Sequence, residues 1–298
     1  MFTGRAVRML AFITALLLLA AWTPAGAQDQ TAAAVAALRA RHAALAGELA
    51  HNAFGRPLHL DSKQVDGDVS GEIHAVLEHP FARLRSALAT AEHWCDVLIL
   101  HINTKQCRAA GGPPANQLIL HIGTKRWQSL ESAQRVVFDF HPVANSTDYL
   151  RIELHADKGP LGSSNYRIVL EAIPLEAGRS FIHLSYAYAY GLAGRLAMQG
   201  YLSTLGSGKV GFTVIGTAGG KPVYIDGVRG VIERNTMRYY LAIDTYAGTI
   251  DAAPRELPDL RLRRWFTAAE QYPRQLHELD EAEYLDTKRK EIERQRGT

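Results

Sequence analysis

The stretch that decides the fold is "DGVRGVIERNTMRYYLAIDTYAG", which runs from Asp226 to Gly248. On a helical wheel its apolar side chains fall within one stripe about 120° wide, formed by Val228, Val231, Ile232, Tyr239, Ala242, Ile243 and Tyr246. The segment is therefore expected to be a long amphipathic helix, which ends before Pro254 and Pro258. Such a helix must cover an apolar surface formed elsewhere in the chain.

The segments before this helix supply that surface. In "GEIHAVLE" (71–78) apolar and polar residues alternate, as in a half-buried strand. A helical segment, "PFARLRSALATAEHW" (80–94), comes next, and a second one, "GLAGRLAMQGYLSTLG" (191–206), precedes the last expected strand. The chain therefore predicts an antiparallel sheet with one apolar face, built from 71–78 and from Gln117–Gly123, Arg135–His141, Tyr149–Ala156, Tyr166–Ala172, Ser180–Tyr190 and Lys209–Gly216.

Helical additions are expected at both ends of this domain. Residues 31–52 are rich in alanine and predict a helix, and the polar stretch Arg56 to Ser70 predicts a linker. After residue 248, "LPDLRLRRWFTAAEQY" and "PRQLHELDEAEYLDTKRKEIERQR" predict two more helices, the last of them a charged surface helix. The expected organisation is residues 28–70 as N-terminal helix and linker, 71–248 as the main domain and 249–298 as a C-terminal helical extension.

The first 27 residues are typical of a secretory signal peptide. Arg5 and Arg8 precede an apolar run from Met9 to Trp22, and Ala25-Gly26-Ala27 has the small-residue pattern of a cleavage site. Cleavage near Ala27 would leave a periplasmic or secreted protein. An uncleaved membrane anchor is the alternative.

Charge and composition exclude one class of partner. The formal net charge is +3, and removal of the signal peptide lowers it by two. Nucleic-acid binding needs a concentrated basic surface, so we expect no nucleic-acid partner. Hydrophobic residues make up 47% of the chain, which is enough for one large core.

The order of elements resembles that of the START-like, or SRPBCC, helix-grip superfamily. The residues that carry the resemblance are the first strand with "EHPFARLRSALATAEHW" (78–94), and the closing helix "GVRGVIERNTMRYYLAI" (227–243). The resemblance covers residues 71–248 and implies an α+β fold, in which a curved antiparallel sheet wraps around the long closing helix. The superfamily includes lipid-transfer domains, aromatase/cyclases and plant carriers of hydrophobic ligands. It therefore implies a cavity for an apolar small molecule or lipid between sheet and closing helix.

Both cysteines lie in "EHWCDVLILHINTKQC" (92–107). Cys95 and Cys107 match neither a C-x-x-C redox motif nor a common zinc spacing, and an even pair in an oxidising compartment most often forms a disulfide. Free thiols, and a metal or nucleophile role, are the alternatives. In helix-grip folds the segment between them often borders the cavity, so the resemblance makes His101, Asn103 and Lys105 candidate rim residues; an exposed polar edge is the alternative.

Four further residues are candidate ligand contacts. Asn235 lies in the middle of the apolar stripe beside Tyr239, and a buried amide must bond either a strand backbone or a ligand. His183 lies in a segment where both alternating faces are apolar or small, so its direction stays open. Ser185 belongs to a small-residue face, which would leave room for a ligand if it faced the interior; a helix packed over it is the alternative.

Other titratable residues are expected at the surface. His74, His121, His141 and His155 share the polar side of their strands, and no metal-binding motif is present, so no metal or cofactor is expected. Arg234 and Arg238 are like charges one helical turn apart, which predicts carboxylate partners in a surface network or, alternatively, an anionic group.

No nucleophile–base–acid set with a recognisable spacing occurs in the chain. We therefore favour a non-catalytic exported carrier of an apolar small molecule or lipid. One alternative is a cyclase- or hydrolase-type enzyme that uses His183, Asn235 and a cavity tyrosine. Another is a ligand-free envelope scaffold that acts through its charged C-terminal helices. Peripheral contact with a membrane or an envelope protein, and the oligomeric state, stay open.

Overall fold

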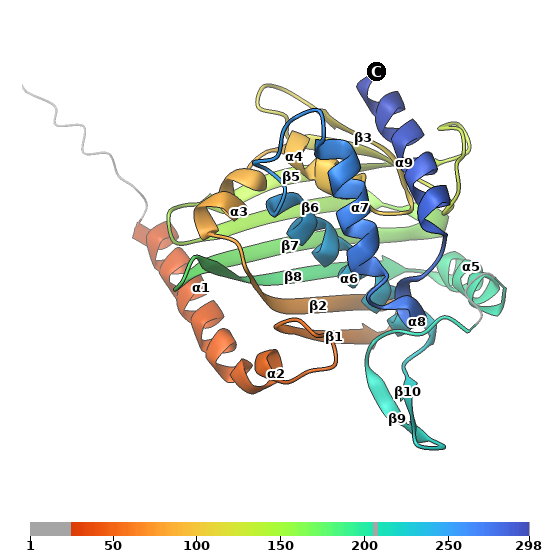
Figure 1. Cartoon of the computed structure of the whole chain (residues 1–298), viewed down its shortest axis with the longest axis horizontal. Coiled ribbons are helices and arrows are strands. Elements are labelled where there is room, and N and C mark those ends of the chain that lie inside the picture. The colour runs from red at the N-terminus through yellow and green to blue at the C-terminus, as the bar shows by residue number, and fades with distance from the viewer. Residues whose placement is uncertain (1–24, 205–207, 298) are drawn as a thin grey trace, which may run out of the picture.

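The computed structural model describes residues 25–204 and 208–297, so nearly all of the expected signal peptide lies outside the described residues. Its main feature is an antiparallel sheet of eight strands in the order β1-β2-β8-β7-β6-β5-β4-β3 (Figure 1). The strands are β1 (Leu58–Val65), β2 (Asp68–Leu77), β3 (Thr104–Ala110), β4 (Gln117–Ile122), β5 (Gln134–Asn145), β6 (Leu150–Lys158), β7 (Ser163–Leu175) and β8 (Arg179–Tyr190). A separate hairpin contains β9 (Val214–Ala218) and β10 (Lys221–Tyr224).

Helices lie on both sides of the sheet and at its ends (Figure 1). They are α1 (Ala25–Ala44), α2 (Ala46–Ala50), α3 (Phe81–Ala87), α4 (Ala91–Leu98), α5 (Leu192–Ser203), α6 (Gly227–Ala247), α7 (Leu257–Ala269), α8 (Pro273–Leu276) and α9 (Glu281–Arg296), with a short 3-10 turn, η1 (Pro160–Gly162). In the described part of the chain, no helix is both long and apolar enough to cross a membrane.

The closing helix α6 crosses one face of the sheet, here called the inner face. It packs against β1, β2 and β8, and Ile232, Leu241 and Ile243 are fully buried in that contact region. Gly71 of β2 permits the close approach, because a Cβ atom there would lie 2.4 Å from the Thr236 hydroxyl oxygen. This arrangement confirms the predicted α+β helix-grip class.

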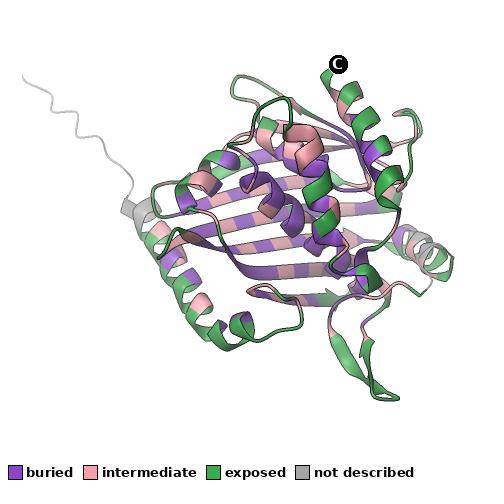
Figure 2. Cartoon of the chain, viewed as in Figure 1, coloured by how far each residue is buried: buried purple, intermediate pink, exposed green. Residues whose placement is uncertain are grey.

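The predicted alternation along the strands is also confirmed. The residues expected to face inward are buried, as the banding of the strands in Figure 2 shows. They include Leu118, Leu120, Val136, Phe138, Phe140, Leu150, Ile152, Leu154, Ile168 and Leu170. Because burial of apolar surface contributes about 25 cal/mol per Å², this face supplies most of the driving force for folding.

The N-terminal helices pack on the opposite, outer face. Val35 and Leu38 of α1, with Leu45 and Leu49, form a second apolar cluster with three residues of the sheet, Val76, Ile173 and Phe181, and with Tyr149, which precedes β6. The alanine-rich helix therefore buries its apolar stripe, as expected. His74, which the sequence places at the surface, is buried beside this cluster, so that expectation is wrong for His74.

The sequence misses both edges of the sheet. Most of the expected linker, residues 56–70, is instead β1 and the start of β2, and β3 at the other edge was not anticipated. Edge strands tolerate polar side chains, and "DSKQV" in β1 and "TKQ" in β3 hide the alternation. The predicted helix 80–94 forms two helices, α3 and α4.

The last expected strand, Lys209–Gly216, does not join the sheet. The backbone N–H groups of Phe212 and Thr213 donate to the carboxylate of Glu233 at 2.6 and 2.9 Å. Because these donors are occupied by Glu233 of α6, the segment runs along the helix, and β9 begins only at Val214. Glu233 thus anchors this segment and does not pair with Arg229, which donates to Ser62 instead.

The charged C-terminal helix α9 is more than a surface helix. One face of α9 is buried against α7 and β3, and this face carries Tyr284, Lys288 and Glu291. The Nζ of Lys105 in β3 lies 2.8 Å from Oε1 of Glu291. The expectation of a fully solvated helix is therefore wrong for this face.

Candidate functional site

A cavity of about 240 Å³ lies between α6, the inner face of the sheet and α5. Its walls combine aromatic rings with a small number of charged and amide groups. The lining residues include Phe138, Tyr166, Tyr186, Tyr188, Tyr190, Met198, Val231 and Tyr239 on the apolar side, and His101, Asn103, Lys125, Arg234, Asn235, Arg238 and Glu278 on the polar side.

Tyrosines form the wall that the sheet contributes. Tyr186, Tyr188 and Tyr190 follow one another at every second position of β8, so all three point to the inner face. Tyr166 of β7 stacks on Tyr188 with ring centroids 5.1 Å apart, and Tyr239 of α6 meets Tyr186 edge-on, also at 5.1 Å. Burial raises the pKa of the Tyr186 and Tyr188 hydroxyls, so they stay neutral. The wall is rigid and apolar, and tyrosine hydroxyl groups lie along its edge.

Helix α5 covers the cavity at the end of β8. Gly194 and Met198 of this helix line the cavity. A Cβ atom at Gly194 would lie 2.9 Å from the Cβ of Tyr190, so glycine allows α5 to lie close to the strand.

Helix α6 contributes two arginines to the polar side of the cavity, and their surroundings differ. Arg238 donates to Glu278 at 3.0 Å, and Glu278 also pairs with Lys125 and with Lys209. Arg234 is only 2% exposed, and within residues 25–204 and 208–297 its one hydrogen bond is to the carbonyl oxygen of Val210 at 3.2 Å. No carboxylate among the described residues lies within salt-bridge distance of Arg234.

His101 lies beside the arginines and is 4% exposed. Its ring stacks on Tyr239 at 4.9 Å, and its Nδ1 accepts a hydrogen bond from the backbone N–H of Asn103 at 3.2 Å. Burial, together with the charges of Arg238 and Lys288, holds its pKa well below the ordinary value, so the ring is neutral. A neutral ring that accepts at Nδ1 carries its proton on Nε2, and the side chain of Asn235 is near enough to interact with this ring.

The structure brings four of the six predicted ligand contacts together. Asn235, Tyr239, His101 and Asn103 all line the cavity. The expectation of a rim position is wrong for Lys105, which is buried against Glu291 instead. The Oδ1 of Asn235 accepts a hydrogen bond from Arg238 at 3.3 Å. Among the described residues, Asn235 makes no hydrogen bond to a strand backbone.

The other two predicted contacts lie on the outer face. Ser185 and His183 occupy the positions of β8 that alternate with the tyrosines, so they point away from the cavity. The expectation that the small side chains would leave room inside is therefore wrong, and the tyrosines face inward instead. His183 is excluded from cavity chemistry on the same ground.

His183 belongs to a charged cluster of its own. Its Nδ1 lies 3.1 Å from Glu171 and its Nε2 lies 3.5 Å from Glu72, while its ring stacks on His74 at 4.4 Å. Burial disfavours the charged ring, but the two carboxylates outweigh it and raise the pKa of His183 to about 9. Burial lowers the pKa of His74 to about 3, so His74 stays neutral. Both carboxylates thus lie beside His183, while Nδ1 of His74 has no hydrogen-bond partner among the described residues.

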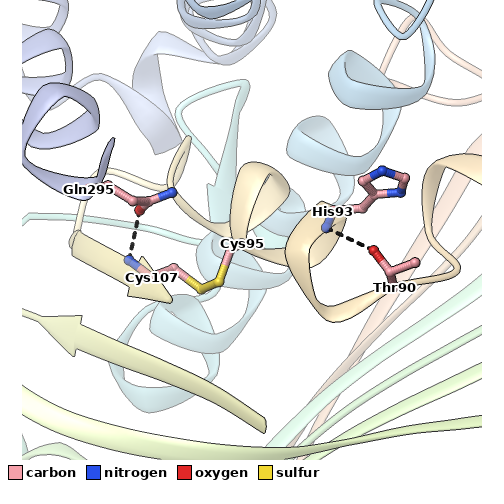
Figure 3. The surroundings of a disulfide bond; sticks show 5 residues. All are labelled: Thr90, His93, Cys95, Cys107 and Gln295. Atoms are coloured by element: carbon pink, nitrogen blue, oxygen red, sulfur yellow. Dashed lines mark hydrogen bonds between the residues drawn. A yellow bond between two sulfur atoms is a disulfide. The ribbon is translucent and has the colours of Figure 1, made fainter. Parts of the chain in front are cut away.

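The predicted disulfide is confirmed. Cys95 of α4 is bonded to Cys107 of β3, and the backbone N–H of Cys107 donates to the Gln295 side chain of α9 at 2.8 Å (Figure 3). Closing a loop of this size contributes roughly 3 kcal/mol in the chain-entropy model. The loop contains His101 and Asn103, so the bond holds two cavity residues in place.

A second hollow, of about 350 Å³, lies at the surface between α6 and α7. Its polar groups are already paired: Asp244 binds Arg56 at 2.8 Å and His79 at 2.9 Å. It lacks the aromatic wall, and we therefore place the candidate site in the cavity beside α5. Within the described ranges no cluster of histidine, cysteine and carboxylate side chains could hold a metal ion.

Sequence reasoning did not select Arg234 or the four inward tyrosines as site residues. The tyrosines have a signal, since "YAYAY" places three of them on one face, but which face it is depends on strand pairing. The missing partner of Arg234 has no signal in the sequence.

No protein-family model matches the chain, and no curated protein matches it. Solved structures with a similar fold include Ara h 8.0201, with a TM-score of 0.36 and 12% identity over 64% of this chain and 99% of that one. Norcoclaurine synthase from Thalictrum flavum gives 0.33 and 14%, over 48% and 87% of the two chains. A conserved protein from Geobacillus kaustophilus gives 0.35 and 9%, over 60% and 95%. At these values the similarity concerns the fold alone, and membership of the START-like superfamily stays a prediction.

Proposed function

We propose that this protein binds a small, largely apolar or aromatic molecule in the cavity between α6 and the inner face of the sheet. The observation that carries the proposal is the cavity itself, about 240 Å³ of space walled by tyrosine rings of the hydrophobic core. Ligand sites are typically concave and mostly apolar, with a few placed polar groups, and this cavity has that composition.

The wall favours a flat or aromatic ligand. Tyr166, Tyr186, Tyr188 and Tyr239 pack against one another, so little side-chain freedom is lost when a ligand contacts them. Covering roughly 200 Å² of apolar surface would contribute about 5 kcal/mol before the cost of association. The hydroxyl groups and Asn235 would then orient the polar parts of the ligand.

We further propose that the protein is exported. The basic start, the apolar run and the Ala25-Gly26-Ala27 pattern support a signal peptide. The disulfide between Cys95 and Cys107 also suits an oxidising compartment. Cell fractionation checks this: uncleaved protein in the cytoplasmic fraction would contradict export.

The binding proposal is tested with N-phenyl-1-naphthylamine, an uncharged aromatic probe whose fluorescence rises in apolar surroundings. Val231 lines the cavity from α6, so Val231→Trp places an indole in the space that the probe would occupy. We expect the protein to bind the probe at one site, and Val231→Trp to weaken binding about tenfold or more because it fills the cavity.

The matched control is Val143→Trp, the same replacement at a position of β5 that is 55% exposed and does not line the cavity. It should bind the probe as the unaltered protein does. Equal binding by both variants, or no binding by the unaltered protein, would contradict the proposal.

A further inference from the structure

We propose that the ligand carries an oxyanion, such as a carboxylate, and that Arg234 binds it. This inference rests on the proposed function, because it concerns the ligand of the same cavity. It adds the chemical class of the ligand: an amphiphile with an aromatic or apolar body and one acidic head.

Five cationic side chains are buried in the described part of the chain. These are Lys105, Arg234, Arg238, Arg261 and Lys288. Four of them have a carboxylate within 3.0 Å: Lys105 and Lys288 share Glu291, Arg238 has Glu278 and Arg261 has Asp96. Arg234 is the exception among the described residues.

The burial of Arg234 costs free energy unless another group supplies the negative charge. A buried ion without a counter-charge loses its hydration and gains no Coulomb energy in return, which costs several kcal/mol. Arg234 has five N–H donors, and the Val210 carbonyl uses one of them. Neighbouring Glu233 does not help, because its carboxylate is occupied by Ser62, Phe212 and Thr213.

Arg234 is also placed where a ligand can reach it. It lines the cavity, and its charge acts on the hydroxyl of Tyr188, which stands in the aromatic wall. An oxyanion at Arg234 would therefore leave the rest of the molecule against the tyrosine rings. The planar fork of a guanidinium fits a carboxylate with two parallel hydrogen bonds.

The charge of the whole polar side agrees with an acidic ligand. Arg238, Lys125 and Lys209 surround a single carboxylate, that of Glu278, and Arg234 adds a further positive charge. The site thus offers an excess of donors and positive charge, which suits an acceptor that is negatively charged.

The test compares two probes that share one body. 8-Anilinonaphthalene-1-sulfonate is N-phenyl-1-naphthylamine with an added sulfonate, so the ratio of their dissociation constants reports the contribution of the anionic group. Arg234→Met removes the guanidinium, and Arg195→Met is the matched control at an exposed position of α5. Calorimetric titration of each variant with each probe gives the affinities.

We expect Arg234→Met to weaken binding of the sulfonate about tenfold or more, because the sulfonate loses its charged hydrogen bonds to the guanidinium. Binding of the uncharged probe should change less than about twofold, and Arg195→Met should change neither. Arg234→Lys keeps the charge but loses the planar guanidinium, so its affinity for the sulfonate should lie between those of the unaltered protein and Arg234→Met.

The outcomes separate the two proposals. If neither probe binds the unaltered protein, the proposed function fails. If both bind but Arg234→Met weakens them equally, or leaves the sulfonate unaffected, the ligand-binding function stands and the oxyanion inference is overturned. If Arg234→Met does not fold, Arg234→Lys decides, because an unchanged ratio of the two affinities in that variant also overturns it.

Discussion

Beneath α9, Lys105 and Lys288 bind the two oxygens of Glu291 at 2.8 and 2.7 Å, and their remaining donors reach backbone carbonyls. In the cavity, Arg234 is buried to a similar degree and has one backbone carbonyl. Both regions place positive charge in the interior, but only the first one supplies a carboxylate to it. The first region is complete without a ligand, and the second is not.

The difference separates structural charge from functional charge. A buried cation that the chain neutralises stabilises one conformation, whereas a buried cation that it leaves unpaired lowers stability in the free protein. Both regions contain buried ionisable groups, so burial or a perturbed pKa alone would mark both of them equally as functional sites. The pairing of each group distinguishes them.

The largest expected effect is in the paired region. Glu291→Gln keeps the shape of the side chain but leaves Lys105 and Lys288 without a counter-charge, so we expect a loss of about 3–5 kcal/mol in the free energy of unfolding. Urea denaturation measures it. Glu293→Gln, at an exposed position of the same helix, should change the value by less than about 0.5 kcal/mol. Equal effects of the two substitutions would show that Glu291 does not balance the lysines.

A smaller effect should depend on pH. Burial, only partly offset by Glu291, lowers the pKa of Lys288 to about 8. Between pH 8 and the ordinary lysine value the unfolded chain binds more protons than the folded one, so Lys288 adds stability as pH rises. Relative to Lys288→Met, the unaltered protein should therefore gain about 2–3 kcal/mol from pH 7.5 to 10.5. A constant difference between the two proteins across this range would refute the lowered pKa.

The smallest effect should have the opposite sign. Arg234→Met removes a buried charge that has no partner among the described residues, so without ligand the protein should lose no stability and gain up to about 1 kcal/mol. Thermal and urea unfolding of ligand-free protein measure it. A loss of more than about 2 kcal/mol would mean that Arg234 is balanced by the fold itself, which would remove the contrast between the two regions.

The parts of the fold that were predictable have strong periodicity. The stripe of α6 and the alternation in β4 to β8 follow from side chains that all meet one core. Strands β1 and β3 were not predictable in this way. Lys105 of β3, for example, is buried only because Glu291 lies above it, and no local pattern announces a lysine in a core.

The site was predictable to a similar extent. Asn235 and Tyr239 stand out because they lie on a helix whose buried side is known, and His101 followed from the resemblance. The direction of Ser185 and His183 depends on the pairing of β8 with β2, where His183 lies opposite His74. The expectation of a surface network is wrong for Arg234 and Arg238, because both are buried. The alternative of an anionic group stays a prediction for Arg234, whose lack of a carboxylate among the described residues becomes visible only in three dimensions.

The bond between Cys95 and Cys107 has a consequence beyond fold stability. The eleven residues it encloses include His101 and Asn103 of the cavity and Lys105 of the buried cluster, so one covalent link holds both regions together. Reduction would remove this link from both regions. A chain that stays in a reducing cytosol would therefore lack a covalent constraint that the oxidised protein places beside the cavity.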